Sequence, residues 1–498
     1  MIRSNVFWGY LFGLSFIAFS SLLALYFFKF QFGGYDLSPI IDLSWRLRNG
    51  EIPGRDFIST FPPIIILLLK IDMFGQSSWF DLVFLNILAI LLIYVLLGVF
   101  QEISDSLLLY GFLLPLVLCV PLVFTNHIWH SSLSQYLAIV FMVGIYSCLY
   151  NPNNLKYFLL FISSILIITA KQNIAVPFVL ISILYVLLSN NINKSIIVLT
   201  VLFGAIFGIA LLNYVFSIPS YSMIYSYYAV LGRGIPTKEM FYQILSGGSV
   251  FPLIFSVASL ILLLGVKLDK NMLSMEYRPY FLFCALAAII PILTDWDSKI
   301  NNAPLLLFVL AYLFYSPVIG IYKEHCIYGR SLIFDYGIIL LFIIIYLLSV
   351  LGGYSRERMK NVGPFYENLS QIEVRGGYFN GLLTGNKFVG ILKEIEITRS
   401  RFLTNRIFFG PRIEFGYLLT KVRSPNGLPL WWHPGTSYST EDEDVVLMNF
   451  INNDFDILFF AKLDRTRMPI KILNFIESNY HQLNNYRYVD VYIRNSTE

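Results

Sequence analysis

Charged side chains are scarce in this chain. Only 13% of its 498 residues are Asp, Glu, Lys or Arg, whereas 57% are hydrophobic. A single water-soluble core would not hide that much apolar surface. The net charge of +4 is small, and no Lys/Arg-rich run with interleaved aromatic residues is present, so we do not expect nucleic acid as a partner. The composition is typical of an integral membrane protein.

Cysteine is also rare. The four cysteines, Cys119, Cys148, Cys284 and Cys326, lie far apart in the sequence. Their spacing fits neither the disulfide framework of a small secreted protein nor a metal-ligand motif. We interpret them as small core residues.

Long apolar runs dominate the first two thirds of the chain. The first run, from Phe7 to Phe28, is too long for the apolar region of a signal peptide and has no convincing cleavage site after it, so it predicts a membrane anchor. With about 20 apolar residues required per span, and shorter spans allowed inside a bundle, the sequence predicts about eleven spans. They are 7–29, 79–100, 107–125, 132–149, 156–170, 173–189, 195–216, 248–266, 280–293, 304–320 and 335–352.

The distribution of Lys and Arg over the short loops places the N-terminus on the cytoplasmic side. An odd number of spans then places the first loop and the C-terminal tail together on the outer face. We therefore expect a multi-pass protein of the plasma (inner) membrane with an extracytoplasmic C-terminal region.

The apolar runs shorten and charges become frequent from about Gly353. The predicted fold is mainly α: a membrane helix bundle over residues 1–352, with a first outer loop at 30–78, followed by a soluble α/β domain over 353–498. Within that domain, periodicity and turn residues predict strands and helices in alternation. The strands are 406–409, 428–431, 455–460 and 486–493, and the helices lie near 412–420, 442–453 and 469–480.

The first loop contains two predicted short helices. Ser38-Pro39 fits an N-cap followed by proline at the first helical position, and Asn49-Gly50 fits the helix end. Asp42 and Arg46 lie four residues apart on this amphipathic helix, which predicts a surface ion pair on a helix at the membrane surface. Pro62-Pro63 can start the second helix, Ile64 to Phe74.

Asp36 has no evident local structural task, because Ser38 already supplies the helix cap. A carboxylate at the mouth of an apolar bundle can act as a general base or bind a cation. The alternative is an ordinary solvated acid in a loop.

Several short motifs occur together. Tyr35-Asp36 follows the first span, Arg55-Asp56-Phe57 and Pro62-Pro63 precede the second short helix, and Thr169-Ala170-Lys171-Gln172 lies between two apolar runs. In this combination the whole chain resembles the GT-C superfamily of membrane glycosyltransferases, and most of all the bacterial relatives of protein O-mannosyltransferases and lipid A aminoarabinose transferases. A many-span bundle followed by a small extracytoplasmic α/β domain also fits that family.

The resemblance implies an inverting glycosyltransferase. Such enzymes move a sugar from a polyprenyl-phosphate carrier to a hydroxyl group of a lipid, glycan or protein at the outer face of the membrane. Asp36 matches the acidic residue that is the presumed base of the family, and Arg55 and Asp56 match its second cluster.

The departing phosphate requires cations around it. Lys171 is the first candidate, with Arg55 and Lys299 behind it, because each is predicted at the outer membrane boundary. Lys171 can alternatively extend its ammonium group to the interface with no ligand.

A divalent metal is possible but not required by the sequence. Asp295 and Asp297 can bind a divalent ion or sugar hydroxyls, or can cap a turn. His127 and His130 are three apart and admit a zinc site, although histidine is also common at membrane interfaces. The loop that contains them has no acid, unlike the family pattern.

Two other functions remain open. A transporter or flippase of lipid-linked glycans would also need many spans, but it would place ionisable residues near the midplane, where this chain has almost none. A non-catalytic assembly protein would keep the bundle without the acids. Loss of sugar transfer in Asp36→Asn would distinguish an enzyme from both.

Overall fold

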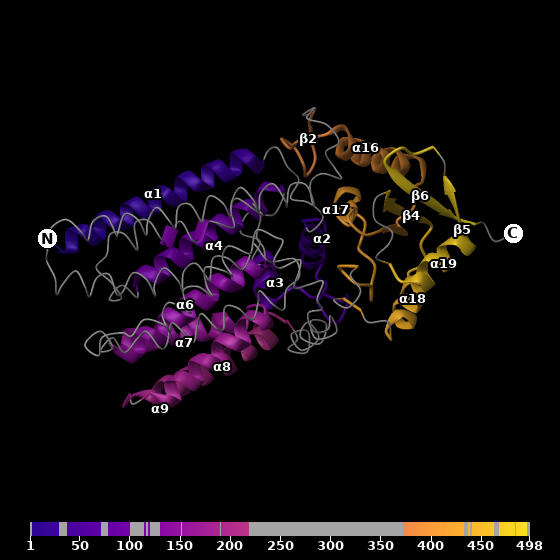
Figure 1. Ribbon diagram of the computed structural model, residues 1–498. Helices are drawn as coiled ribbons and strands as arrows, with labels where there is room; N and C mark the ends of the chain where they lie inside the picture. Colours follow the sequence, from indigo (N-terminus) through magenta and orange to yellow (C-terminus); the bar gives the residue numbers. More distant parts are fainter. Residues whose placement is uncertain are drawn as a thin grey trace, which may run out of the picture. The chain divides into compact units, whose positions relative to one another are not determined.

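The computed structural model (Figure 1) describes part of the chain. The chain forms two compact units. The bundle unit holds the described residues up to Ala24 together with those of Asn86–Ala210. The loop–sheet unit holds Leu25–Leu85, the residues from Leu211 to 218, and the described C-terminal residues. The described residues are 2–28, 37–70, 78–99, 114–115, 118–119, 130–150, 152–189, 191–218, 372–432, 437–438, 441–462, 468–483 and 485–495.

Long apolar helices make up the bundle unit. Three of them, at Phe80–Gly98, His130–Leu149 and Lys194–Val215, are long and apolar enough to cross a membrane, which is expected of a multi-pass membrane protein. The helices are α1 (Ile2–Phe28), α4 (Phe80–Val99), α6 (His130–Tyr150), α7 (Asn154–Ile168), α8 (Gln172–Leu188) and α9 (Lys194–Ala210), the last continuing as the π-helix η3 (Leu211–Val215).

Helix α6 is the most buried of these helices and contacts α7, α8 and α9. Helix α9 shows the opposite pattern, because much of its surface is exposed, including Phe203 and Ile206. Its other face approaches α7 closely: a Cβ added to Gly204 would lie 2.6 Å from Ser164 Cβ and 2.8 Å from the carbonyl oxygen of Phe161. Small residues permit such close approach of membrane helices.

Six of the predicted spans coincide with helices of the structure: those at 7–29, 79–100, 132–149, 156–170, 173–189 and 195–216. The span at 107–125 is described only at 114–115 and 118–119. The four later spans, from 248 to 352, lie outside the described residues. The total of about eleven therefore stays a prediction.

The loop–sheet unit contains a four-stranded mixed sheet in the order β3-β4-β6-β5. The pair β3–β4 is parallel, with Phe408 opposite Leu458, and the other neighbours are antiparallel. A separate antiparallel pair, β1–β2, precedes it. The elements are β1 (Ile372–Glu373), β2 (Leu383–Thr384), α16 (Asn386–Arg401), β3 (Ile407–Phe409), α17 (Gly416–Thr420), α18 (Glu443–Asn452), β4 (Ile457–Ala461), α19 (Ile470–Asn479), β5 (Tyr480–Leu483) and β6 (Val489–Arg494).

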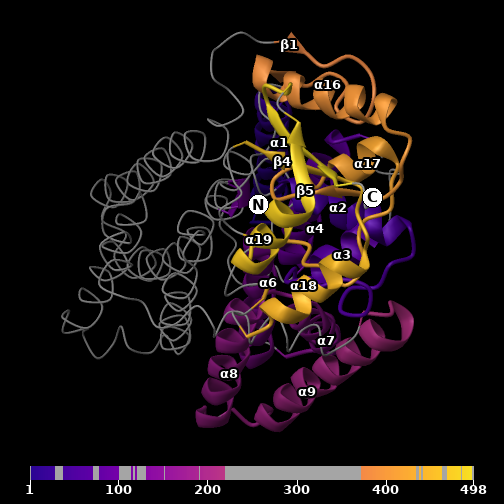
Figure 2. The ribbon, with the colours of Figure 1, turned by 90° about the vertical axis from the view of Figure 1, so that its right-hand side faces the viewer.

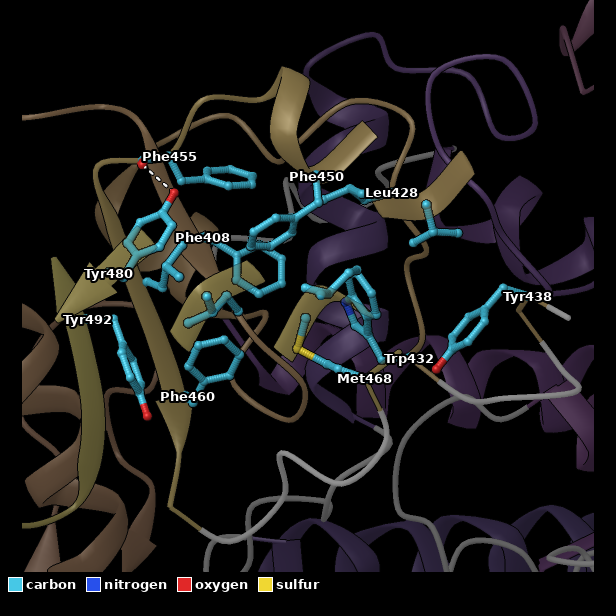
Figure 3. Close-up of a cluster of buried hydrophobic side chains, with 14 residues drawn as sticks. Phe408, Leu428, Trp432, Tyr438, Phe450, Phe455, Phe460, Met468, Tyr480 and Tyr492 are labelled. Carbon is cyan, nitrogen blue, oxygen red and sulfur yellow. Dashed lines mark hydrogen bonds between the residues drawn. The ribbon is translucent and has the colours of Figure 1, made fainter. Parts of the chain in front are cut away.

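An aromatic core lies between the sheet and the helix pair α18–α19, which run side by side in Figure 2. Phe408 contacts Phe450 edge-on at 5.1 Å between ring centroids (Figure 3). The Tyr480 hydroxyl donates to the carbonyl oxygen of Phe455 at 2.8 Å, drawn as the dashed line. Alternate residues along β3 point to opposite faces, and Phe409 accordingly packs edge-on against Tyr417 of α17 instead.

The α/β character of the C-terminal region and its mixed sheet are confirmed, with three of the four predicted strands and all three predicted helices present. The strand predicted at 428–431 is wrong. Pro429 has no N–H group and forms only an isolated bridge with Ile58 of the first loop, in which Ile58 N donates to the Leu428 carbonyl and Leu430 N to the Ile58 carbonyl. Helix α16 and strand β5 were not predicted.

Both short helices predicted in the first loop are present, as α2 (Leu37–Arg48) and α3 (Pro63–Lys70). Gly50 follows α2 with φ of +78°, a conformation that favours glycine at a helix end. Nine of the twelve residues of α2 are buried, and its neighbours are α3 and α17. The loop–sheet unit therefore combines segments from both sides of the predicted domain boundary near Gly353.

Candidate functional site

Helix α2 carries a buried ion pair that joins the first loop to the C-terminal region. Arg46 Nε donates to Asp42 Oδ2 at 2.9 Å, and both side chains are 1% exposed. Arg46 also donates to the Pro425 carbonyl oxygen, and the Ser424 hydroxyl donates to Asp42. The predicted pairing of Asp42 with Arg46 is confirmed, but its predicted surface exposure is wrong, because the segment around Ser424 covers this face of α2.

Glu51 completes the network around Arg46. Its carboxylate accepts from Arg46 at 2.9 Å, and the guanidinium group lies 4.7 Å from the ring centroid of Phe57. Burial raises the pKa of both Asp42 and Glu51, and the positive charge of Arg46 opposes both shifts. Two carboxylates thus depend on one buried cation.

A second buried contact holds the start of α2. Ser38 Oγ donates to Glu414 Oε2 at 2.5 Å and accepts from the backbone N–H of Phe415 at 3.2 Å. Ser38 is fully buried and Glu414 is 3% exposed. Burial raises the pKa of Glu414 to about 7.

Backbone hydrogen bonds fix the rest of the loop. Trp45 Nε1 donates to the Val422 carbonyl oxygen at 2.8 Å, and Gly427 N donates to the Asp56 carbonyl oxygen at 2.6 Å. The ring of Phe61 stacks on Trp431 at 5.8 Å between centroids. The residues from 38 to 61 therefore have partners in the C-terminal region at several points along their length.

Arg55 and Asp56, two of the predicted substrate-binding residues, form an ion pair with each other at 2.6 Å. Asp56 also accepts from the backbone N–H of Ile52 at 2.7 Å, which closes the turn around Gly54. Arg55 holds the pKa of Asp56 below its usual range. The Arg55 side chain is 59% exposed, so its outer surface is accessible to an anion.

Lys171, in the bundle unit, is the residue before α8. Its backbone N–H donates to Ser134 Oγ at 2.8 Å, and the same hydroxyl donates to the His130 carbonyl oxygen at 2.6 Å. This serine ties the turn between α7 and α8 to the first turn of α6. The predicted turn at 169–172 is thus present as a helix–helix connection.

The remaining predicted positions fall elsewhere. Asp36, the predicted base, and Lys299 lie outside the described residues, as do Asp295, Asp297 and His127. Asp36 directly precedes Leu37, the first residue of α2. Among the predicted site residues, the structure brings Arg55 and Asp56 together in one unit, and Lys171 belongs to the other.

The described part of the chain contains no group of three or more His, Cys, Asp or Glu side chains arranged to hold a metal ion. Trp431 and Trp432 are adjacent aromatic residues of a kind that can stack on a sugar, but the pair is in large part internal: Trp432 is 2% exposed within the aromatic core. Phe61 covers one face of the Trp431 ring.

The prediction of Ser38 as the N-cap is wrong: α2 begins at Leu37, so Ser38 lies inside the helix, and its hydroxyl bonds to Glu414 and to the backbone N–H of Phe415. Sequence reasoning thus missed Ser38 as an interface residue, together with Glu414 and Ser424. One signal was available for Glu414, which is the one acid in the largely apolar stretch 407–420 and has Arg412 two residues before it. Acids in such a setting are commonly buried and paired. Ser424 carries no comparable signal, because serine is common in loops of every kind.

No protein-family model matches this chain, and no curated protein matches it. The likeness to membrane glycosyltransferases consequently rests on the short motifs of the sequence.

Proposed function

We propose that this protein is a membrane glycosyltransferase that moves a sugar from a polyprenyl-phosphate carrier to a hydroxyl acceptor at the outer face of the membrane. The acceptor belongs to a lipid, a glycan or a protein. The proposal is supported by the sequence motifs and by one structural observation, the docking of the first loop onto the C-terminal α/β region.

That docking fixes α2, whose first residue, Leu37, directly follows the proposed catalytic acid in the sequence. Ser38, two residues after Asp36, is held by Glu414 and by the backbone of Phe415. The buried Asp42–Arg46 pair then anchors the next turn of α2. Catalytic groups work best when rigid neighbours hold them in place, and a loop with only a linking role would not require charged groups buried at its base.

The reaction needs two kinds of group. The acceptor oxygen forms a bond to the anomeric carbon while the carbon–oxygen bond to the carrier phosphate breaks, with its electron pair leaving on the phosphate. In the proposed mechanism Asp36 takes the acceptor proton as general base. Lys171, Lys299 and the exposed guanidinium group of Arg55 are the candidates for stabilising the negative phosphate.

Asp56 has a different role in this proposal. Its carboxylate is engaged by Arg55 and by the backbone N–H of Ile52. It therefore orients the Arg55 side chain and maintains the turn, while Arg55 is the candidate of this pair for binding the donor phosphate.

The test is transfer of labelled sugar from polyprenyl phosphate into lipid, glycan and protein fractions of membranes that contain the protein. We expect transfer by the native chain and loss of transfer in Asp36→Asn at equal membrane insertion. Asp444→Asn is the matched control, because Asp444 lies in an exposed ion pair with Lys471 on α18 and α19. Its transfer should equal that of the native chain.

Equal transfer by the native chain and Asp36→Asn would exclude Asp36 as the base. Absence of transfer across several donors, together with retained binding of the carrier lipid, would favour transport or assembly of lipid-linked glycans over catalysis.

A further inference from the structure

The first turns of α6 are polar, although they are buried inside an apolar bundle. Polar groups in such a place are costly and commonly mark a ligand path. Ser132 shows that cost directly, because its hydroxyl is buried and has no hydrogen-bond partner among the described residues. Five of the first six residues of α6 are polar and at most 8% exposed: His130, Ser131, Ser132, Ser134 and Gln135.

Helix α8 begins beside the start of α6. The backbone N–H of Lys171, the residue before α8, donates to Ser134 Oγ at 2.8 Å, and Ser134 donates in turn to the carbonyl oxygen of His130 at 2.6 Å. The N-terminal ends of two neighbouring helices therefore meet at one end of the bundle unit. Each end carries a partial positive charge and backbone N–H groups without a partner inside the helix, an arrangement that attracts anions.

Neither helix start supplies an anion of its own. The N-cap of α8 is Lys171, whose side chain forms no capping hydrogen bond and whose ammonium group can only donate. Helix α7, in contrast, has an ordinary cap, because the Asn153 side chain accepts from the backbone N–H of Lys156 at 2.9 Å. A cation at a helix N-terminus is unfavourable by itself, so the start of α8 favours an external anion.

The C-terminal end of α7 lies at the same turn and carries the opposite partial charge. Its carbonyl oxygens are engaged within the turn: that of Leu166 accepts from the backbone N–H and the hydroxyl of Thr169, and that of Ile167 accepts from the backbone N–H of Ala170. No Asp or Glu is present in α6, α7 or α8. The three helices therefore contain no carboxylate to balance Lys171 and the two helix starts.

We propose that the adjoining starts of α6 and α8 form a binding site for a phosphate group. The backbone N–H groups of the two first turns and the Ser132 hydroxyl donate to the phosphate oxygens, and the Lys171 ammonium group balances their charge. Helical side chains tilt toward the N-terminus, which directs Ser132 to this end of α6. The choice of the carrier phosphate as the ligand rests on the proposed function, whereas a phosphate site does not itself depend on sugar transfer.

Direct binding tests the site without requiring catalysis. The probe is radiolabelled farnesyl phosphate, a short polyprenyl phosphate, and the full-length protein is held in nanodiscs of phosphatidylcholine, a lipid without net charge. Farnesol, which lacks the phosphate, gives the background. We expect saturable binding of farnesyl phosphate that weakens as salt is added, because the site recognises charge.

Two variants assign the binding to this site. Lys171→Gln removes the charge, and Ser132→Ala removes the hydroxyl. Each should weaken the affinity for farnesyl phosphate by about tenfold or more, as expected for the loss of a hydrogen bond to a charged group. Lys171→Arg keeps the charge and should retain most of the affinity.

Ser147→Ala and Lys194→Gln are the matched controls. Ser147 is a buried serine near the other end of α6, and its hydroxyl likewise has no partner in the described part of the chain. Lys194 is an exposed lysine at the start of α9. Neither change should alter the binding of farnesyl phosphate.

Thermal unfolding of the ligand-free chains separates binding from structure. Because Ser132→Ala removes a buried hydroxyl with no partner, it should leave the unfolding midpoint unchanged or raise it. A midpoint below that of the native chain would assign the hydroxyl to a structural role and overturn its place in the site. Equal affinity of the native chain, Lys171→Gln and Ser132→Ala, or binding no stronger than that of farnesol, would overturn the site as a whole.

Two competitors identify the source of the phosphate: phosphatidylglycerol in the nanodisc and inorganic phosphate in solution. We expect neither to displace farnesyl phosphate at equal concentration. Displacement by one of them would overturn the carrier as the ligand and assign the site to a membrane headgroup or to free phosphate. Binding that passes these tests in a chain that transfers no sugar would defeat the transferase proposal and support the phosphate site.

Discussion

Replacement of Arg46 by methionine should undock α2 from the C-terminal region. Methionine preserves much of the length and apolar stem of arginine, so the change removes mainly the charge. It leaves two carboxylates, on Asp42 and Glu51, without the cation that now pairs with both. Breaking a buried pair by removing one partner costs about 3–5 kcal/mol.

The same loss can be expressed as a rate. Because about 1.36 kcal/mol corresponds to a factor of ten, the exchange of α2 amides limited by undocking should accelerate by roughly 10² to 10⁴-fold. The effect should be largest near neutral pH and shrink in acid, since protonation of Asp42 removes the orphan charge. Hydrogen exchange measured by mass spectrometry on the purified full-length protein provides the assay.

Two comparisons make this prediction refutable. Arg48→Met alters an exposed arginine on the same helix and should change α2 exchange little. The double variant Asp42→Asn/Arg46→Met should be less destabilised than Arg46→Met alone, because it removes one of the unpaired charges. If Arg46→Met and Arg48→Met have the same effect, the Arg46 network does not hold α2 in place.

Two further predictions concern other contacts. Glu394→Gln should destabilise the loop–sheet unit by about 1–3 kcal/mol, because the Glu394 carboxylate accepts from the backbone N–H groups of Arg487, Tyr488 and Val489. Thermal unfolding measures the loss, with a change at an exposed residue of the same helix, Glu396→Gln, as the control. Equal unfolding midpoints for the two variants would contradict the reasoning. Gly204→Val should push α9 away from α7, since its added atoms would meet Ser164 and Phe161. We expect a lower yield and a lower thermal stability in detergent than for Ile206→Val, a change on the exposed face of α9. Equal thermal stability of the two variants would mean that the close contact between α7 and α9 does not stabilise the protein.

The elements of the fold were predictable where the sequence pattern is local. Apolar runs located the described bundle helices, and Ser38-Pro39 and Asn49-Gly50 located α2 to within a residue or two. Helix α16 was overlooked although Phe388, Ile391 and Ile395 recur at helical spacing, because Gly390 and the charged residues between them make the segment unlike the apolar runs. The short β5 follows α19 directly, and only Ser478-Asn479, with no Gly or Pro, mark the change.

The candidate site was predictable only in part, because its main contacts join distant segments. The i, i+4 spacing of Asp42 and Arg46 correctly predicted their pairing. Their burial depends on residues 424 and 425, and nothing near α2 in the sequence indicates that partner. A short amphipathic helix with one ion pair has the same local pattern whether its polar face meets water or a second segment of protein.

The separation of these partners has a consequence for the synthesis of the chain. Arg46 and the Pro425 carbonyl oxygen that it binds are 379 residues apart. At a ribosomal rate of about 5–20 residues per second, α2 emerges roughly 20–75 seconds before its partner. Throughout that interval Asp42 and Arg46 have only their neighbours in the first loop, such as Glu51 and Phe57, while later apolar helices are being made. The docking of this loop must therefore be among the last events of folding, after nearly the whole chain has been synthesised.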